Sequence, residues 1–223
     1  MPRPFVTVAS AETPDGVLAL KQRDTRDFLI THQGRVLMNS MAHRSEQMLG
    51  TLACAPLKHR KSPRVLVGGL GMAITLRAVL DSLPADAEVV VAELNPVMLA
   101  WCRGPLAALT DRAVDDPRVR VLIADVTAVI ADAANTGLLY DAILIDLYVG
   151  PHAHTPASDK LYGVGASTRA RDALTRGGVY TVWGESYHKQ FAETLTRAGF
   201  TVTHERPGRG GMRHVVYVGT RAA

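Results

Sequence analysis

From Arg64 onward, short continuous apolar runs alternate with longer segments whose apolar residues recur at helical spacing. The runs are RVLVGG, AEVVVAEL, RVRVLIAD, YDAILIDLY and VYTVWGES, followed near the end by TVTHERP and MRHVVYVGT. A strand that is apolar on both faces needs cover on both faces, as in a parallel sheet between two layers of helices. The sequence therefore predicts an α/β fold with a doubly wound, Rossmann-like, seven-stranded sheet, the last two strands of which form an antiparallel hairpin.

The intervening segments predict the helices of the two layers. They are AITLRAVLDSL, PVMLAWCRGPLAAL, VTAVIADAANTG, DKLYGVGASTRARDALTRGG and YHKQFAETLTRAGF. Pro96 stands at a plausible first helical position. Gly177 and Gly178 are the expected C-cap of the fourth helix.

The N-terminal quarter has a different pattern. Between Val17 and Ser40, short apolar runs alternate with turn residues, which predicts a β-hairpin or a three-stranded element. The segment MAHRSEQMLGTLACAPL then has helical spacing, and KHRKSPR is a polar connector. We expect a division into an N-terminal β element with its helix, residues 1–57, and a binding domain, residues 58–223.

Bulk composition narrows the class of protein. The chain has 223 residues and no apolar run of about 18 residues, and its N-terminus lacks a signal-peptide core. We therefore expect a cytoplasmic protein with no membrane partner. Cys54 and Cys102 show no metal or redox spacing, which predicts two free, buried thiols. The net charge is +4, but the one basic cluster, HERPGRGGMRH, has no interleaved aromatic residues, so no nucleic-acid partner is expected.

A glycine loop follows the first strand of the predicted parallel sheet. Gly68, Gly69 and Gly71 lie where ligands bind in such sheets, at the carboxyl end of a strand. The motif reads GLGMAI and lacks the third glycine of dinucleotide-binding loops, which argues against a pyrophosphate. Glu93 ends the second strand about twenty residues later, where a carboxylate accepts hydrogen bonds from ribose hydroxyls.

Two more carboxylates end successive strands. Asp125 ends the third predicted strand and Asp146 ends the fourth. One such residue is easily explained as a helix cap, but three at neighbouring strand ends converge on one crevice. The combination favours a nucleoside without a phosphate, and S-adenosylmethionine is the leading candidate.

Two histidine-containing stretches could suggest other chemistry. His152 and His154 lie close together in a loop, but no third ligand is nearby in sequence, so no metal site is expected. The stretch SYHKQ offers no readable nucleophile–base–acid arrangement, so a hydrolase is not favoured. Gly184, Glu185 and Ser186 follow the fifth strand and could contact a substrate.

Several of these motifs together resemble the spermidine synthase family, the polyamine aminopropyltransferases, a branch of the class I S-adenosylmethionine-dependent methyltransferase superfamily. The motifs are RVLVGGLGMAITLRAVL, VVVAELNPVMLAWCR, DDPRVRVLIADV and YDAILIDLYVGP, with GRVLMNSMAHRSEQML upstream, and they lie within residues 17–185. The resemblance implies that Glu93 binds the ribose and Asp125 the adenine amino group. It further implies that Asp146, and Glu46 on a gate helix, face the acceptor, and that the N-terminal element can form a homodimer.

Three departures from this family shape the functional expectation. Met72 replaces the Asp that the family holds near the donor's aminopropyl arm, Ser45 replaces a His or Gln, and the segment Leu147–Val149 lacks a second Asp. We therefore expect a methyltransferase that uses S-adenosylmethionine and acts on a small amine-bearing metabolite. The alternatives are an aminopropyltransferase that uses decarboxylated S-adenosylmethionine, and a non-catalytic nucleoside-binding protein.

The expected site residues fall into three groups. Asp146 and Tyr148 are the candidate catalytic residues. Glu46, His43 and Tyr148 are the candidate substrate contacts. The candidate cofactor-binding residues are Gly68, Gly69, Gly71, Glu93, Leu94, Asp125, Val126 and Asn39.

Overall fold

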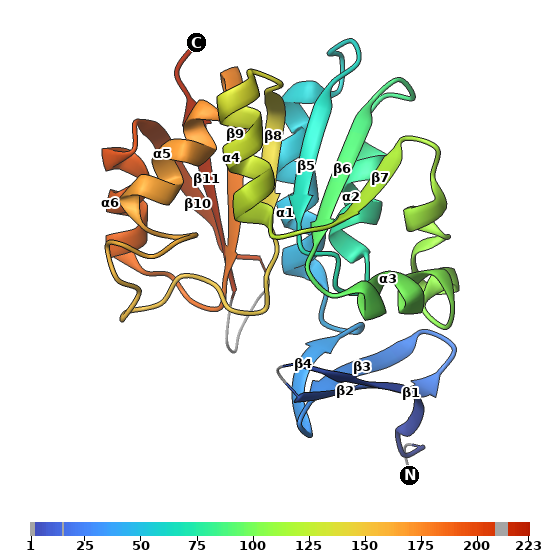
Figure 1. Cartoon of the computed structure of the whole chain (residues 1–223). Helices are drawn as coiled ribbons and strands as arrows, with labels where there is room; N and C mark the ends of the chain where they lie inside the picture. The colour runs from blue at the N-terminus through green and yellow to red at the C-terminus, as the bar shows by residue number, and fades with distance from the viewer. Residues whose placement is uncertain (1–2, 15, 208–213) are drawn as a thin grey trace.

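The computed structural model describes residues 3–14, 16–207 and 214–223. Its larger part is a seven-stranded sheet with the order β10-β11-β9-β8-β5-β6-β7 (Figure 1). The strands are β5 (Arg64–Gly68), β6 (Glu88–Glu93), β7 (Val119–Ile123), β8 (Tyr140–Ile145), β9 (Leu174–Gly184), β10 (Phe200–Glu205) and β11 (Val215–Arg221). Strands β5 to β9 are parallel, and β11 runs antiparallel between β9 and β10. The predicted fold class is confirmed.

Alternating side chains of the central strands enter two separate cores. In β5, Val65 and Val67 pack with helices α1 (Arg44–Cys54), α2 (Ile74–Ser82) and α3 (Pro96–Arg103). Leu66 points to the other face, which α4 (Val126–Thr136), α5 (Val164–Asp172) and α6 (Lys189–Arg197) cover. Both faces exclude water, which is why these strands read as continuous apolar runs. Helix α1 therefore packs on the large sheet, although it follows the small one in sequence.

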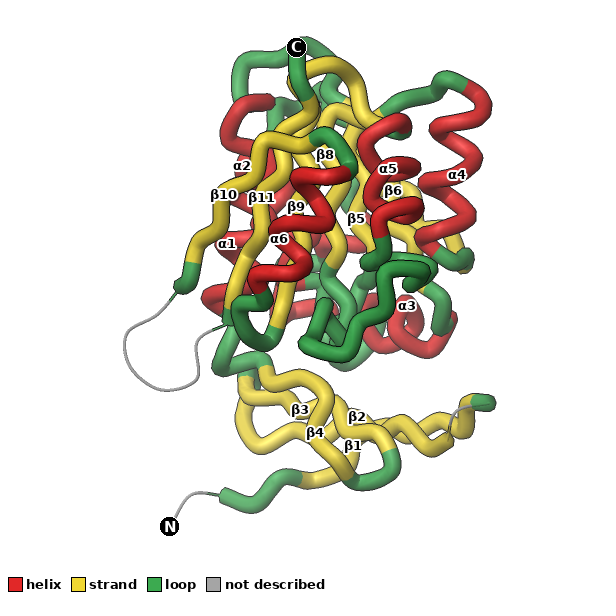
Figure 2. The backbone as a smooth tube through the Cα atoms, turned by 90° about the vertical axis from the view of Figure 1, so that its left-hand side faces the viewer, coloured by secondary structure: helices red, strands yellow, loops and turns green. Residues whose placement is uncertain are grey.

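The N-terminal element is an antiparallel meander of four strands, where the sequence predicts a β-hairpin or a three-stranded element. They are β1 (Val6–Thr13), β2 (Gly16–Asp24), β3 (Asp27–His32) and β4 (Arg35–Asn39), and the sheet lies beneath the large one (Figure 2). The prediction missed β1 because most of its side chains are exposed, so it has no apolar run. Leu20, Phe28 and Ile30 form the buried side of this small sheet. A division of the chain at residue 57 stays a prediction.

Two expected helix ends are wrong. The fourth predicted helix, α5, ends at Asp172, and Gly177 and Gly178 lie inside β9 rather than at a C-cap. The pairing of β8 with β9 shifts register between Tyr140 and Ala142, and Gly177 has a φ of +71°. A glycine pair serves a bulge as well as a cap, and the sequence alone does not separate the two uses.

The second error lies after β6. Helix α3 ends at Arg103 instead of continuing to Leu109, and two short 3₁₀ turns follow, Ala107–Thr110 and Ala113–Asp115. Gly104 is the C-cap of α3 and Pro105 follows it, so the chain cannot keep the helical hydrogen bonds there.

The expected free thiols are confirmed: Cys54 and Cys102 are both buried and unpaired. Burial raises the pKa of each to about 12, so neither is a reactive thiolate near neutral pH. Among the described residues, no helix is long and apolar enough to span a membrane. Most of the basic cluster HERPGRGGMRH, at 208–213, lies outside the described residues.

Candidate active site

The glycine loop follows β5 at the carboxyl edge of the sheet. Gly69 has a φ of +93°, and a Cβ there would overlap the carbonyl oxygen of Asp146. A Cβ on Gly68 would lie 2.6 Å from Cγ2 of Val126, the first residue of α4. On the other side of the loop, a Cβ on Gly71 would lie 3.1 Å from Sδ of Met38 in β4. The loop is therefore packed closely on three sides and tolerates only glycine at Gly69.

Glu93 ends β6 and is buried directly beside this loop. Its Oε2 accepts a hydrogen bond from the Leu70 backbone N–H at 2.8 Å, and its Oε1 accepts one from Asn95 N–H at 2.7 Å. Each oxygen keeps a second lone pair, so the carboxylate can also accept from ligand hydroxyls. The next residue, Leu94, is 70% exposed at the mouth of the crevice.

Asp125 lies at the end of the adjacent strand and is the N-cap of α4. Its Oδ1 accepts hydrogen bonds from the N–H and the Oγ1 hydroxyl of Thr127, both at 2.8 Å. The side chain is exposed, and its second oxygen is left for a ligand. A backbone hydrogen bond from Ala124 N–H to the Glu93 carbonyl holds the two strand ends together at 3.0 Å. We call this half of the crevice the donor end.

A cavity of about 320 Å³ adjoins the loop on the side of β8 and β9. Its walls come from β4, α1, the start of α2 and the segments after β8 and β9, with His214 just before β11. Glu46, Asp146 and Glu185 line it, and its described lining includes no lysine or arginine. The remaining walls are largely apolar. We call this the acidic cavity.

Asp146 follows β8 and faces this cavity. The Thr75 hydroxyl donates to its Oδ2 at 2.6 Å. Burial raises the pKa of Asp146 to about 7, with a smaller contribution from the negative charge of Glu46, and the Thr75 hydrogen bond opposes the shift. This carboxyl group therefore exchanges a proton near neutral pH, as a general base requires.

A chain of two hydrogen bonds links the Glu46 carboxylate to Ser45 and then to His214. The buried Ser45 hydroxyl donates to Oε2 of Glu46 at 2.6 Å, and Oγ of Ser45 lies 2.9 Å from Nδ1 of His214. The His214 ring packs edge-on against Trp183, with ring centroids 4.9 Å apart. These four side chains come from α1, from β9 and from the residue before β11.

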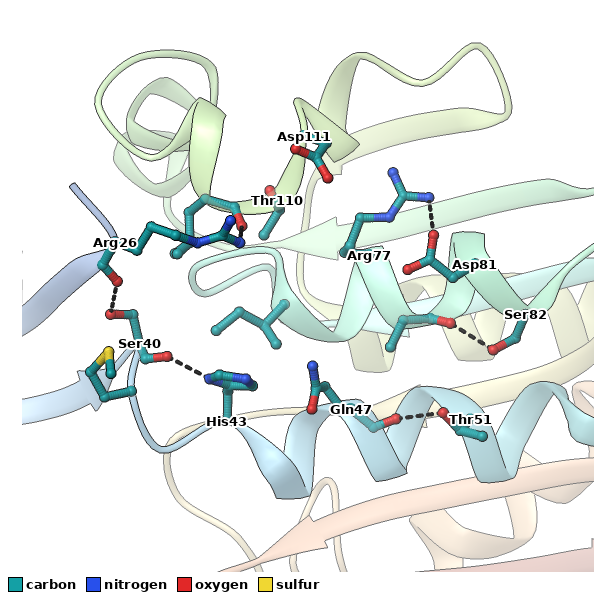
Figure 3. A pocket seen from close by; sticks show the side chains of 14 residues that line it. Arg26, Ser40, His43, Gln47, Thr51, Arg77, Asp81, Ser82, Thr110 and Asp111 are labelled. Carbon is teal, nitrogen blue, oxygen red and sulfur yellow. Dashed lines mark hydrogen bonds and ion pairs between the residues drawn. The ribbon is translucent and has the colours of Figure 1, made fainter.

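The other sequence-predicted residues divide between two places. Tyr148 and Asn39 line the acidic cavity, where Tyr148 is 61% exposed and Oδ1 of Asn39 accepts from Met41 N–H. His43 is placed elsewhere. It lines a second cavity of about 570 Å³ between α1, α2 and the turn at Leu109, where its Nδ1 lies 2.6 Å from the Ser40 carbonyl (Figure 3). The structure does not bring His43 together with Asp146.

Sequence reasoning missed Thr75 and His214. Thr75 stands in the first turn of α2, and its position soon after the glycine loop could have drawn attention to it. His214 is 169 residues from its partner Ser45, and no local pattern indicates that pairing. His152 and His154 are exposed, and the described residues hold no group of three or more residues arranged for a metal ion.

Comparison with known proteins finds relatives that are polyamine aminopropyltransferases. No protein-family model matches the chain. The polyamine aminopropyltransferase of Mycobacterium tuberculosis is 25% identical over 201 residues, covering 85% of this chain and 38% of that protein. That of Shewanella oneidensis is 31% identical over 169 residues, covering 68% of this chain and 28% of that protein. The chain thus spans less than two fifths of these relatives' length.

Solved structures agree on the fold. A spermidine synthase in complex with the transition-state analogue AdoDATO matches with a TM-score of 0.76 and 17% identity, over 97% of this chain and 72% of that one. Spermidine synthase from Thermotoga maritima matches with a TM-score of 0.74 and 18% identity, over 96% of this chain and 72% of that one.

These relatives overturn the expectation of a methyltransferase, because those that match are aminopropyltransferases. That expectation rested on Met72, a buried residue in place of a loop carboxylate, and on the absence of any visible replacement for its charge. The structure places Glu46 and Asp146 in the same cavity as Met72, so negative charge is present there from other elements. The chain is spermidine synthase-like, with the class I S-adenosylmethionine-dependent methyltransferase-like fold.

Proposed function

We propose that this chain is an aminopropyltransferase that uses decarboxylated S-adenosylmethionine as donor and a small amine as acceptor. The observation that carries the proposal is the acidic cavity, in which three carboxylates and apolar walls adjoin the glycine loop. Carboxylates pair with ammonium groups, and apolar walls such as Trp183 and Leu147 suit methylene chains. The chain as a whole has a net charge of +4, so this local negative charge is not a property of the overall composition.

The donor end fits the nucleoside part of such a donor. Glu93 offers a lone pair on each oxygen to the ribose hydroxyls, and Asp125 offers its second oxygen to the adenine amino group. Gly69 and Gly71, with φ of +93° and +50°, let the loop pass close to Asp146 and Met38, where a Cβ would meet those residues. The donor's sulfonium supplies an activated carbon for transfer.

The acidic cavity then has two tasks. It must hold the acceptor amine against that carbon, and it must accept a proton, because only an unprotonated amine is a nucleophile. A C–N bond forms as the C–S bond breaks, the sulfur keeps the electron pair of the broken bond, and a neutral thioether nucleoside leaves. Asp146 receives the proton that the amine loses. Its raised pKa suits this role.

The test uses purified protein and two donors. Calorimetric titration should show binding of decarboxylated S-adenosylmethionine and much weaker binding of S-adenosylmethionine. With 1,4-diaminobutane as the probe acceptor, chromatography should show the aminopropylated amine and the thioether nucleoside in equal amounts. Methyl transfer to the amine, or tight donor binding with no turnover on any diamine or triamine tested, would contradict the proposal.

A further inference from the structure

Asp146 and Glu46, two carboxylates of the acidic cavity, are each held by one hydroxyl group. The Thr75 hydroxyl donates to Oδ2 of Asp146, and the Ser45 hydroxyl donates to Oε2 of Glu46, both at 2.6 Å. Both hydroxyl residues are buried, with exposures of 2% for Thr75 and 3% for Ser45. In each case one carboxylate oxygen is fixed by the protein, and the other has no hydrogen-bond partner among the described residues.

The two carboxylates differ in the second hydrogen-bond partner of the hydroxyl group that donates to them. Among the described residues, the second hydrogen-bond partner of the Thr75 hydroxyl is the Glu46 backbone carbonyl, at 3.3 Å. Ser45 has His214, whose Nδ1 lies 2.9 Å from the serine oxygen. A hydroxyl has one proton, and Ser45 gives it to Glu46, so His214 must donate from a protonated Nδ1. The three residues therefore form a directed chain of hydrogen bonds, from His214 through Ser45 to Glu46.

His214 is fixed in place for this role. Its ring lies edge-on against Trp183, at an interplanar angle of 68°, and both residues line the acidic cavity. Ser45 is the residue before Glu46, so the same helix, α1, positions both side chains. Loss of the histidine N–H would free the Ser45 hydroxyl to turn, and Glu46 would lose its preferred orientation.

We propose that Ser45 and His214 are positioning residues that hold Glu46 as the anchor for the ammonium end of the acceptor that does not react. This rests on the proposed function of the same cavity. Asp146, whose charge responds to pH near neutrality, is then the group that takes the proton at the reacting end. The two carboxylates thus have different roles because different groups hydrogen-bond to them, Thr75 to Asp146, and Ser45 with His214 to Glu46.

The kinetic test compares Ser45→Ala, His214→Leu and His214→Asn, with 1,4-diaminobutane as acceptor. The side-chain N–H of asparagine can replace Nδ1–H, whereas leucine has no donor. We expect Ser45→Ala and His214→Leu each to raise the acceptor KM about 10-fold or more, with kcat and donor Kd within about 3-fold of wild type. His214→Asn should stay close to wild type. The double variant Ser45→Ala/His214→Leu should be no worse than either single change, because both act through Glu46.

Ser167→Ala is the matched control, because Ser167 is also fully buried in a helix and its hydroxyl has no partner among the described residues. It should leave the acceptor KM unchanged. The proposal is overturned if the main loss falls on kcat or donor Kd, if asparagine and leucine at position 214 behave alike, or if the two losses multiply.

A second readout does not require turnover. Long-range ¹H–¹⁵N correlation spectra should show the His214 ring protonated on Nδ1 in the wild type, with the signal assigned by its absence in His214→Asn. In Ser45→Ala this tautomer should no longer dominate. A wild-type ring protonated on Nε2 alone would refute the positioning role. If the wild type has no aminopropyl transfer, the proposed function fails separately, and the calorimetric Kd of 1,4-diaminobutane takes the place of KM.

Discussion

The donor end and the acidic cavity meet at the glycine loop, but they are built differently. At the donor end, the side-chain hydrogen bonds of Glu93 and Asp125 span 2 to 23 residues. In the acidic cavity, Thr75 and Asp146 are 71 residues apart, and Ser45 and His214 are 169 apart. The donor end is therefore a product of neighbouring strand–turn–helix units. The acidic cavity exists only when the whole sheet and α1 have assembled.

The carboxylates of the two regions also have different surroundings. Glu93 is held by two backbone N–H groups, which suits a fixed hydrogen-bond acceptor for a neutral ribose. Asp146 is buried and has the negative neighbour Glu46, which raise its pKa to about 7 against the opposing effect of one hydroxyl donor, Thr75. Under the proposed function, one region serves binding and the other serves proton transfer, and substitutions should separate the two.

The largest expected effect is that of Asp146→Asn on turnover. Asparagine can keep the hydrogen bond from Thr75 but cannot accept a proton, so kcat should fall by about 100-fold or more. Donor binding should be unchanged, because the donor end does not depend on this charge. Steady-state kinetics and donor calorimetry check both statements. Wild-type turnover in this variant would remove Asp146 from the reaction.

The same variant should show the opposite effect on stability. The folded-state pKa of Asp146 is about 7 and the ordinary value is 3.8, so the native state holds a proton that the unfolded chain releases between these pH values. Wild-type stability should therefore fall as pH rises from about 4 to about 7, and asparagine should abolish that part of the loss. Thermal melts at pH 5 and pH 8 should show the gain in Tm for Asp146→Asn mainly at pH 8.

Next in size is Gly69→Ala, which tests the donor end. The residue has a φ of +93°, and an added Cβ would overlap the Asp146 carbonyl, so unfolding free energy should fall by more than about 3 kcal/mol and donor binding should be lost. Gly137→Ala is the matched control. Gly137 also has a positive φ, +75°, but nothing lies within 4 Å, so its cost should be about 1 kcal/mol. Equal losses in urea melts would show that backbone strain alone matters at Gly69.

The smallest expected effect is a shift in pH dependence in Thr75→Val. Removing the hydroxyl removes the one bond that lowers the pKa of Asp146, so this pKa should rise further. The rising limb of kcat against pH should move upward by about one unit. Thr181→Val is the control, since Thr181 is fully buried and its hydroxyl has no partner among the described residues. An unshifted limb in Thr75→Val would mean that Asp146 does not set it.

The sequence predicts features that depend on local contacts, as at the donor end, better than features that depend on long-range contacts, as in the acidic cavity. The parallel sheet could be predicted because its central strands are apolar on both faces, and the places of Glu93 and Asp125 could be predicted because each lies at the end of a strand. Their roles stay a prediction. Strand β1 was missed because it is exposed, and Gly177 was misplaced because a bulge and a cap use the same residue type. His214 could not be predicted, since its contact with Ser45 depends on tertiary assembly. The methyltransferase expectation failed for this reason too, because Glu46 and Asp146 meet Met72 only in three dimensions.

Strand β11 is the last of the described strands in sequence, yet it lies inside the sheet, between β9 and β10. During synthesis, β10 therefore leaves the ribosome before the strand that joins it to the sheet. Because His214 immediately precedes β11, the hydrogen-bond chain to Glu46 can close only after translation has passed Arg221. Under the proposed function, a nascent chain can thus form the donor end well before the acidic cavity, so donor recognition should mature earlier than acceptor recognition on the ribosome.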